Sequence, residues 1–149
     1  MKVIVFSGLD GAGKSTQIDN LQRMFVSQNK KCYVFWSRGG YTPGFQFLKN
    51  LLRFIFRNRL PKPGFSTERK KALSNNLIRR LWLKIAIIDL IYFYSFYLRL
   101  KLFFGFTIIC DRYLIDTLID FNIAYPNEKV ENWMLWKLLD YTSLKPDFH

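Results

Sequence analysis

A glycine-rich loop near the start of the chain has the residue types and spacing of a phosphate-binding site. Gly8, Gly13, Lys14 and Ser15 satisfy the spacing G-x-x-x-x-G-K-[ST], directly after the apolar run "VIVF". Glycines let backbone amides approach phosphate oxygens, and a helix that begins at the lysine adds partial positive charge. We therefore expect phosphate binding by the whole loop: Gly8, Gly11, Ala12, Gly13, Lys14, Ser15 and Thr16.

The polar side chains of this loop have separate predicted roles toward a nucleoside triphosphate. Lys14 should reach the β- and γ-phosphates, Ser15 should ligate Mg²⁺, and Thr16 can bond the α-phosphate. Asp10 differs, because a carboxylate among phosphates is unfavourable unless it faces another ligand. We expect Asp10 to face the phosphate acceptor, by bonding a hydroxyl or orienting the attacking group. The alternative is a turn-forming Asx residue.

Two more candidate sites follow apolar runs. Asp111 and Arg112 come directly after "FTIIC". The carboxylate can hold a Mg²⁺-bound water, and the guanidinium can bridge the donor and acceptor phosphates. Arg38, after "KCYVFWS", is placed to bind the acceptor's phosphate with a two-pronged fork. The alternatives are a structural salt bridge for the Asp-Arg pair and a solvated loop arginine for Arg38.

Apolar patterning supplies the elements that must position these residues. It predicts strands over 2–7, 31–36 and 106–110, and helices over 14–28, 45–57, 67–104 (possibly as two helices), 113–124 and 129–141. The alternation predicts an α/β fold with a parallel sheet and helices on both faces. Ligands bind at the carboxyl ends of such strands, so the three motifs should line one crevice.

Composition limits the class of partner. The 149 residues suit one domain, and the net charge of +12 favours nucleotides, nucleic acid or anionic lipid. The sequence contains no nucleic-acid-binding motif, so no specific nucleic-acid partner is expected. Cys32 and Cys110 lie in apolar runs and are interpreted as small buried hydrophobes in a reducing compartment, which places the protein in the cytoplasm.

The most apolar stretch is "IAIIDLIYFYSFYL", residues 85–98. It is shorter than the ~20 residues that span a bilayer, and Asp89 interrupts it. We expect a buried helix here, with contact to a membrane surface as the alternative.

With these motifs in place, the sequence resembles the thymidylate kinases of the nucleoside monophosphate kinase group. The resemblance is carried by "GLDGAGKSTQ", "SRGG" and "CDRYLIDTLID", in this order. It implies a three-layer P-loop NTPase fold and transfer of the ATP γ-phosphate, with Mg²⁺, to a nucleoside monophosphate such as dTMP. Lys14, Ser15 and Thr16 would bind ATP-Mg²⁺. Asp10 would meet the acceptor sugar, Arg38 the acceptor phosphate and Arg112 both phosphates, which makes Lys14, Arg112 and Asp10 the expected catalytic residues.

Several positions depart from the family's pattern and leave the acceptor open. Where the family has F-A-A-D-R, Asp89 matches the aspartate but Leu90 replaces the arginine. Where it has serine and tyrosine after DRY, this chain has Asp116 and Asp120, which share one helix face. These carboxylates suit sugar hydroxyls or a cation, or they face solvent. The acceptor is dTMP-like, or else sugar-, lipid- or polysaccharide-linked.

The sequence ends at "LKPDFH", where the family usually begins its fourth strand. We therefore expect one P-loop kinase domain over 1–149 that is incomplete at its C-terminus, with an exposed sheet edge beside the first strand. It is a fragment or a degenerate relative, and a non-catalytic nucleotide-binding role is a further alternative. The family is often dimeric through helices flanking the sheet, so residues 85–98 are candidates for a homodimer interface.

Overall fold

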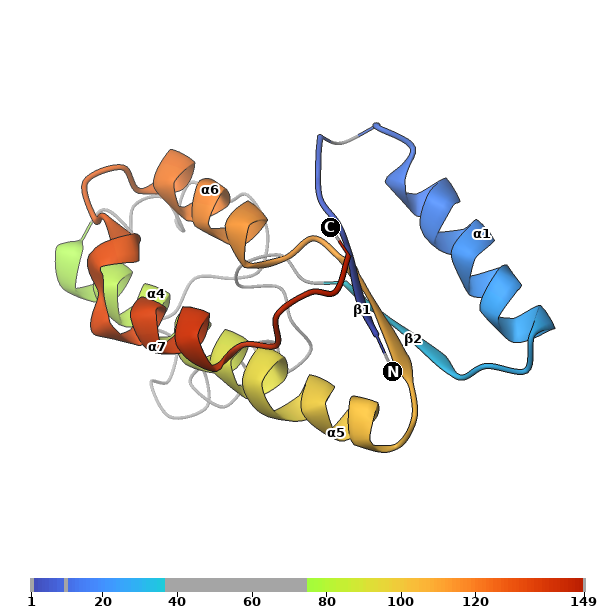
Figure 1. The fold of residues 1–149 in the computed structure, drawn as a ribbon. Coiled ribbons are helices and arrows are strands. Elements are labelled where there is room, and N and C mark those ends of the chain that lie inside the picture. The colour runs from blue at the N-terminus through green and yellow to red at the C-terminus, as the bar shows by residue number, and fades with distance from the viewer. Residues whose placement is uncertain (1, 10, 37–74, 149) are drawn as a thin grey trace, which may run out of the picture.

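A parallel three-stranded sheet forms the centre of the computed structural model, which describes residues 2–9, 11–36 and 75–148 (Figure 1). The strands are β1 (Val3–Phe6), β2 (Cys32–Trp36) and β3 (Thr107–Asp111), in the spatial order β1-β3-β2. The register pairs both Phe6 and Trp36 with Asp111, so the carboxyl ends of the strands are level with one another. The predicted α/β class with a parallel sheet is confirmed.

Helices cover both faces of this sheet, as predicted. Helix α1 (Lys14–Ser27) lies on one face, and the other helices lie on the opposite face (Figure 1). They are α4 (Asn76–Ile91), α5 (Leu98–Phe103), α6 (Leu114–Ala124) and α7 (Met134–Thr142). A π-helical turn, η1 (Tyr92–Tyr97), joins α4 to α5, and a 3₁₀ turn, η2 (Val130–Asn132), precedes α7.

Helices α4 and α5 form one continuous helical segment with η1. The Asn75 side chain caps its start by accepting a hydrogen bond from the Leu77 amide at 2.9 Å. At its end, Gly105 has φ +83°, and its amide returns to the Leu102 carbonyl at 2.9 Å. This is the left-handed C-terminal turn that glycine favours. The segment therefore begins at Asn76, and the predicted start near residue 67 lies outside the described residues.

One side of this long segment builds the core. Leu83, Ile87, Leu90 and Tyr94 have no exposed surface there. Phe35 of β2 packs edge-to-face against this side, with its ring centroid 5.5 Å from that of Tyr94. The segment is 28 residues long and contains an 18-residue window with a mean hydropathy of 1.5, so by length and composition it is a candidate membrane span; 44% of that window is buried in the fold. The expected burial of residues 85–98 is confirmed for one side of the segment.

Two predicted helical features are wrong. The helix expected over 129–141 is broken at Trp133, whose ψ of 140° is extended and separates η2 from α7. Met24, expected in the apolar side of α1 with Ile18, Leu21 and Phe25, is 47% exposed. The spacing of 18, 21 and 25 places those three on a narrow strip facing the sheet, and Met24 lies outside it.

The two cysteines are free thiols, as expected, but only Cys110 is fully buried, while Cys32 is half-buried. Burial raises the pKa of Cys110 to about 12.

The last described residues run beside β1. The Val5 amide donates to the Phe148 carbonyl at 2.9 Å, and the Asp147 amide donates to the Val3 carbonyl at 2.8 Å. Ile4 and Phe148 form a parallel bridge. Residues 147–148 therefore cover part of the sheet edge that was predicted to be exposed. The predicted helix over 45–57 lies outside the described residues.

Candidate phosphate-binding site

A pocket of about 420 Å³ opens at the carboxyl ends of the three strands. This volume lies within the range of small-molecule sites. The loop after β1, the last residue of β2 and the end of β3 all contribute to it. The lining residues are Gly11, Gly13, Lys14, Ser15, Thr16, Trp36, Asp111 and Arg112. The glycine loop and the Asp-Arg pair thus share one crevice, as their strand positions predicted.

The start of α1 lies in this pocket without an acidic partner of its own. Gly13 is the N-cap and supplies no side-chain acceptor. The Gln17 amide bonds to the Gly13 carbonyl at 3.1 Å, so the amides of Lys14, Ser15 and Thr16 precede the first intrahelical bond. The first turn, "KSTQ", contains a lysine and no carboxylate. A positive helix end with free amide donors is an arrangement that an anion stabilises.

The glycines of the loop are required by backbone geometry. Gly8, Gly11 and Gly13 have φ values of +139°, +84° and +77°, which L side chains rarely adopt. Apart from the glycine itself and its two chain neighbours, no atom lies within 4 Å of the position that a Cβ would take at any of the three. The loop therefore holds open space beside its backbone, and the conformation itself selects glycine.

Lys14 folds back over the same loop. Its Nζ donates to the Gly8 carbonyl at 2.8 Å and also to the Leu9 carbonyl. These carbonyl bonds are exchangeable, because an ammonium group has three donors on a flexible stem. The charge is thus held at the loop, where a phosphate could replace the carbonyl partners.

Arg112 has an unusual backbone for a residue with a side chain. Its φ is +74°, in the left-handed region. Its amide donates to the Phe6 carbonyl at 2.9 Å, and its carbonyl accepts from the Tyr94 hydroxyl at 3.5 Å. Neighbouring elements on both sides therefore hold this conformation. Strain of this kind is concentrated at functional sites.

Asp116 serves the fold. Its Oδ2 accepts the Tyr113 amide at 2.9 Å and the Ser7 hydroxyl at 2.7 Å. It thereby caps α6 and ties this helix to the end of β1. Neither Asp116 nor Asp120 belongs to the described lining of the pocket. Their predicted contact with the acceptor stays a prediction.

The sequence analysis did not predict the α6 cap by Asp116 or the position of Trp36 in the pocket. The cap could have been predicted, because Asp116 is an acidic residue three positions after the helix N-cap. Trp36 is 47% exposed and lines the pocket, whereas its neighbour Phe35 is buried on the other side of the sheet. Strand alternation could have found it. Asp10 and Arg38 lie outside the described residues, so their predicted roles are not placed.

The residues of the pocket fit a Mg²⁺ ion that arrives with a nucleotide. Ser15 brings a hydroxyl oxygen and Asp111 a carboxylate to the same lining, and Mg²⁺ takes oxygen ligands. Within the described part of the chain, no group of three or more His, Cys, Asp or Glu residues could hold a metal. Phosphate oxygens and water would complete the coordination, as is usual for this ion.

Comparison with known proteins gives a distant similarity. No protein-family model matches the chain. A thymidylate kinase from Caldicellulosiruptor saccharolyticus is 26% identical to it, over 99% of this chain and 62% of the relative. The chain thus spans less than two thirds of the length of that protein. The similarity supports a thymidylate kinase-like or P-loop kinase relationship.

Proposed function

We propose that this chain is an ATP-dependent phosphotransferase of the thymidylate kinase type, which binds the donor triphosphate at the start of α1. One observation carries the proposal: three helix-end amides, Lys14 and Arg112 converge on a single pocket. All of these groups are positive or donate hydrogen bonds, as binding a polyphosphate requires. The similarity to a thymidylate kinase supports a kinase-like activity.

Each of these residues has a separate role in the proposed phosphoryl transfer. The amides of Gly13 to Thr16 hold the phosphates, and Lys14 exchanges its two carbonyl partners for phosphate oxygens. Ser15 and Asp111 would hold Mg²⁺, which supplies charge neutralisation at the phosphates when bound. Arg112 lies at the end of the central strand β3 and stabilises the charge that develops between donor and acceptor. Asp10 and Arg38 are proposed to bind the acceptor, as the resemblance implies.

A nucleoside monophosphate such as dTMP is the first candidate acceptor. An acceptor outside the dTMP class is the second, and Leu90 favours it. This leucine stands where the thymidylate kinase pattern has an arginine, and it is fully buried in the core. It therefore offers no group to a base. Asp116, at one of the other departing positions, is committed to the α6 cap.

The direct test is single-turnover transfer from γ-labelled ATP by the 149-residue chain, with dTMP, other nucleoside monophosphates and phosphorylated sugars as acceptors. We expect label on one acceptor class, and none from a Lys14→Ala variant. A matched control is Lys137→Ala, on α7 away from the pocket, which should transfer normally. Absence of transfer to every acceptor, together with equal ATP binding by Lys14→Ala, would refute the proposal.

A further inference from the structure

Trp36 is the one large apolar side chain in the described lining of the pocket. The other lining residues are two glycines and five residues with polar or charged side chains. We propose that the indole of Trp36 stacks against the sugar ring of the phosphate acceptor, so that the site recognises the acceptor by a phosphorylated sugar and not by a base. The inference rests on the proposed function, because it assigns the acceptor's ring to that same pocket.

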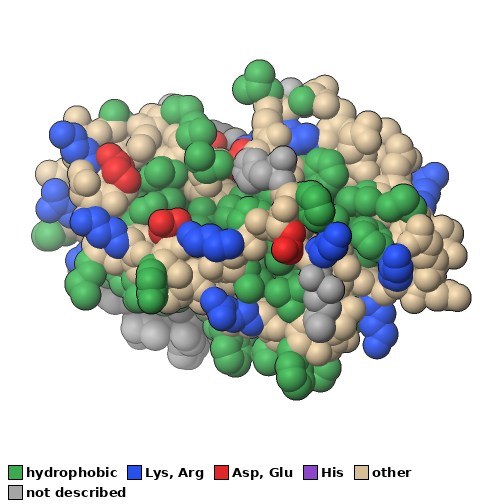
Figure 2. Space-filling view, viewed as in Figure 1, with side chains coloured by type: hydrophobic (Ala, Val, Ile, Leu, Met, Phe, Trp, Pro, Cys, Tyr) green, Lys and Arg blue, Asp and Glu red, His purple; other side chains and the backbone are tan. Residues whose placement is uncertain are grey.

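The charge around the pocket favours an acceptor that carries phosphate. Lysine and arginine side chains are spread over the face shown in Figure 2, where acidic side chains are fewer. The whole chain has a net charge of +12, and Lys14 and Arg112 bring positive charge to the lining itself. A phosphorylated compound is therefore attracted to this end of the sheet. The indole adds a preference for a compound that also has an apolar ring face.

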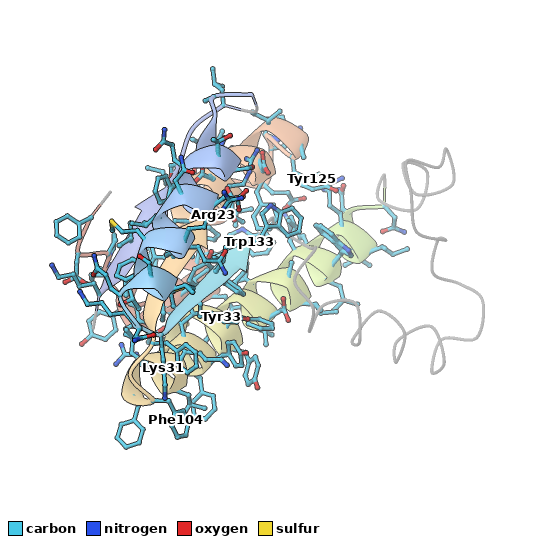
Figure 3. All side chains as sticks on the ribbon, turned by 90° about the vertical axis from the view of Figure 1, so that its right-hand side faces the viewer. Arg23, Lys31, Tyr33, Phe104, Tyr125 and Trp133 are labelled. Carbon is cyan, nitrogen blue, oxygen red and sulfur yellow. The ribbon has the colours of Figure 1, made fainter. Side chains whose placement is uncertain are left out.

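The indole faces the side of the sheet on which α1 packs. Successive side chains of a strand point to opposite faces. Phe35 is 3% exposed and lies against Phe93, with ring centroids 5.4 Å apart, on the α4 side. Trp36 therefore points to the other face, and it is 47% exposed. Figure 3 shows Lys31 and Tyr33 at the start of β2, from which the strand leads to Trp36 at its other end.

The order of the strands places Trp36 on the acceptor's side of the pocket. The glycine loop follows β1, Arg112 follows β3, and Trp36 ends β2. The spatial order is β1-β3-β2, so the central strand separates Trp36 from the strand that carries the donor's loop. In the proposed reaction the phosphoryl group passes Arg112 on its way from donor to acceptor. The indole lies beyond this arginine, where the acceptor would bind.

The short distance from Trp36 to the reacting end of the pocket identifies the ring as a sugar. Trp36 and Asp111 are register partners on β2 and β3, and neighbouring strands lie about 4.8 Å apart. A ring on the indole is thus close to Asp111 and Arg112, where the accepting phosphate would lie. In a sugar phosphate, the ring is joined to the phosphate directly or through one carbon. In a nucleotide, the base is a whole sugar farther away.

An indole and a sugar ring have complementary surfaces. One face of a sugar ring consists of C–H groups, which bury apolar area on the indole, while the hydroxyls around the rim stay free for hydrogen bonds. A base also stacks on an indole, but here it would have to take the sugar's place beside the phosphate. Leu90, where the thymidylate kinase pattern has an arginine, is fully buried and offers no group to a base.

Two substitutions separate stacking from hydrogen bonding by the indole. The indole has one donor, Nε1–H, which could bind a phosphate oxygen instead of leaving the ring face to a sugar. Trp36→Phe keeps an aromatic face and removes this donor, whereas Trp36→Ala removes both. The matched control is Tyr141→Ala, because Tyr141 is an aromatic residue of α7 that is 85% exposed and lies outside the described lining.

The first measurement is the intrinsic fluorescence of the 149-residue chain without ATP. The other three tryptophans belong to the helical layer on the opposite face of the sheet: Trp82, Trp133 and Trp136. The chain is titrated with ribose 5-phosphate, glucose 1-phosphate, dTMP, AMP and inorganic phosphate. We expect at least one of the two sugar phosphates, but not inorganic phosphate, to shift the emission to shorter wavelengths, because the indole leaves water. Trp36→Phe should abolish this shift.

The second measurement is the dissociation constant of each compound by calorimetry. For compounds that bind, Trp36→Ala should weaken binding about tenfold, because the apolar wall is lost, and Trp36→Phe should stay within about threefold. The loss should be the same for nucleotides with different bases and for a sugar phosphate without a base. Tyr141→Ala should bind like the unaltered chain. Circular dichroism and thermal melting confirm that all three variants are folded.

Three results would overturn the inference. The first is no emission shift with either sugar phosphate. The second is equal weakening by Trp36→Phe and Trp36→Ala, which would assign the role to the indole N–H. The third is a loss with dTMP or AMP that ribose 5-phosphate does not show, which would place a base on the indole.

Single-turnover transfer from ATP separates this inference from the proposed function. Trp36→Ala should raise the acceptor concentration that gives the half-maximal rate about tenfold and leave the maximal rate within about threefold. Transfer with an unchanged acceptor requirement in Trp36→Ala would overturn the inference and leave the proposed function standing. Binding of sugar phosphates through Trp36 without any transfer would support the stacking and refute the proposed function.

Discussion

Replacing Arg112 with glycine should relieve an unfavourable backbone conformation and should also remove the guanidinium that the proposed phosphoryl transfer needs. Its φ of +74° is unfavourable for any residue with a Cβ by about 1–2 kcal/mol. Glycine adopts this conformation freely but loses more chain entropy on folding. The cleanest comparison is Arg112→Gly against Arg112→Ala, because both lack the guanidinium and differ only in the Cβ.

From this geometry we expect Arg112→Gly to be about 1 kcal/mol more stable than Arg112→Ala. In a chain of this length that difference corresponds to about 2–4 °C in the melting midpoint. Both variants should lose phosphoryl transfer at least about 100-fold, since each removes a cation aimed at developing charge. Thermal melting and urea denaturation measure the difference in stability, and single-turnover assays measure the loss of phosphoryl transfer.

Arg112→Lys is the control that retains both a positive charge and the strained backbone. It should melt near Arg112→Ala and transfer faster than either variant. If Arg112→Ala were as stable as Arg112→Gly, the left-handed conformation would not be that of the folded chain. If Arg112→Gly transferred phosphate normally, the guanidinium would have no part in the reaction.

Three further predictions concern local features that stabilise the fold. Asn29, with φ 53° after α1, should be replaceable by glycine with a gain of about 0.5–1 kcal/mol, measured by urea denaturation. Glu128→Gln should destabilise by about 1.5–3 kcal/mol, because Glu128 accepts from Arg79 at 2.6 Å and Arg80 at 2.9 Å; unchanged stability would contradict this. Burial acts to raise the pKa of Glu128, but the two arginines outweigh it and lower the pKa below 4.5. The contribution of Glu128 to the free energy of unfolding should therefore be present above that pH and lost on further acidification. A pH series of unfolding midpoints should show this loss, and Glu128→Gln should flatten it. Asp116→Ala should lower the free energy of unfolding by about 1–2 kcal/mol, because it removes the α6 cap and the hydrogen bond from Ser7. An unchanged melting curve would contradict this structural role of Asp116.

The parallel sheet and the shared pocket could be predicted because they rest on local, strong signals. The strands are short apolar runs that end at glycine or at charged residues, and parallel pairing brings those ends together. The C-terminal turn at Asn29 also follows from its residue type, since asparagine tolerates positive φ. The three helix-end amides follow once Lys14 is known to open the helix.

The remaining features depend on tertiary contacts that no spacing reveals. The π turn at Tyr92–Tyr97 and the break at Trp133 both lie in sequences with good helical patterning, so packing decides them. The bond that holds Asp116 at the start of α6 comes from the hydroxyl of Ser7, the residue after β1, which is 109 positions away in sequence. The side of α4 that faces away from the sheet is apolar like the core side, and only the fold shows which side meets the sheet.

Amide NMR of the chain titrated with ATP and Mg²⁺ tests the central claim most directly, because it reports on the helix-end donors themselves. We predict large, saturable shifts for the amides of Lys14, Ser15 and Thr16, and none for Leu139 in the buried part of α7. Shifts elsewhere only, or none at all, would contradict phosphate binding at the start of α1.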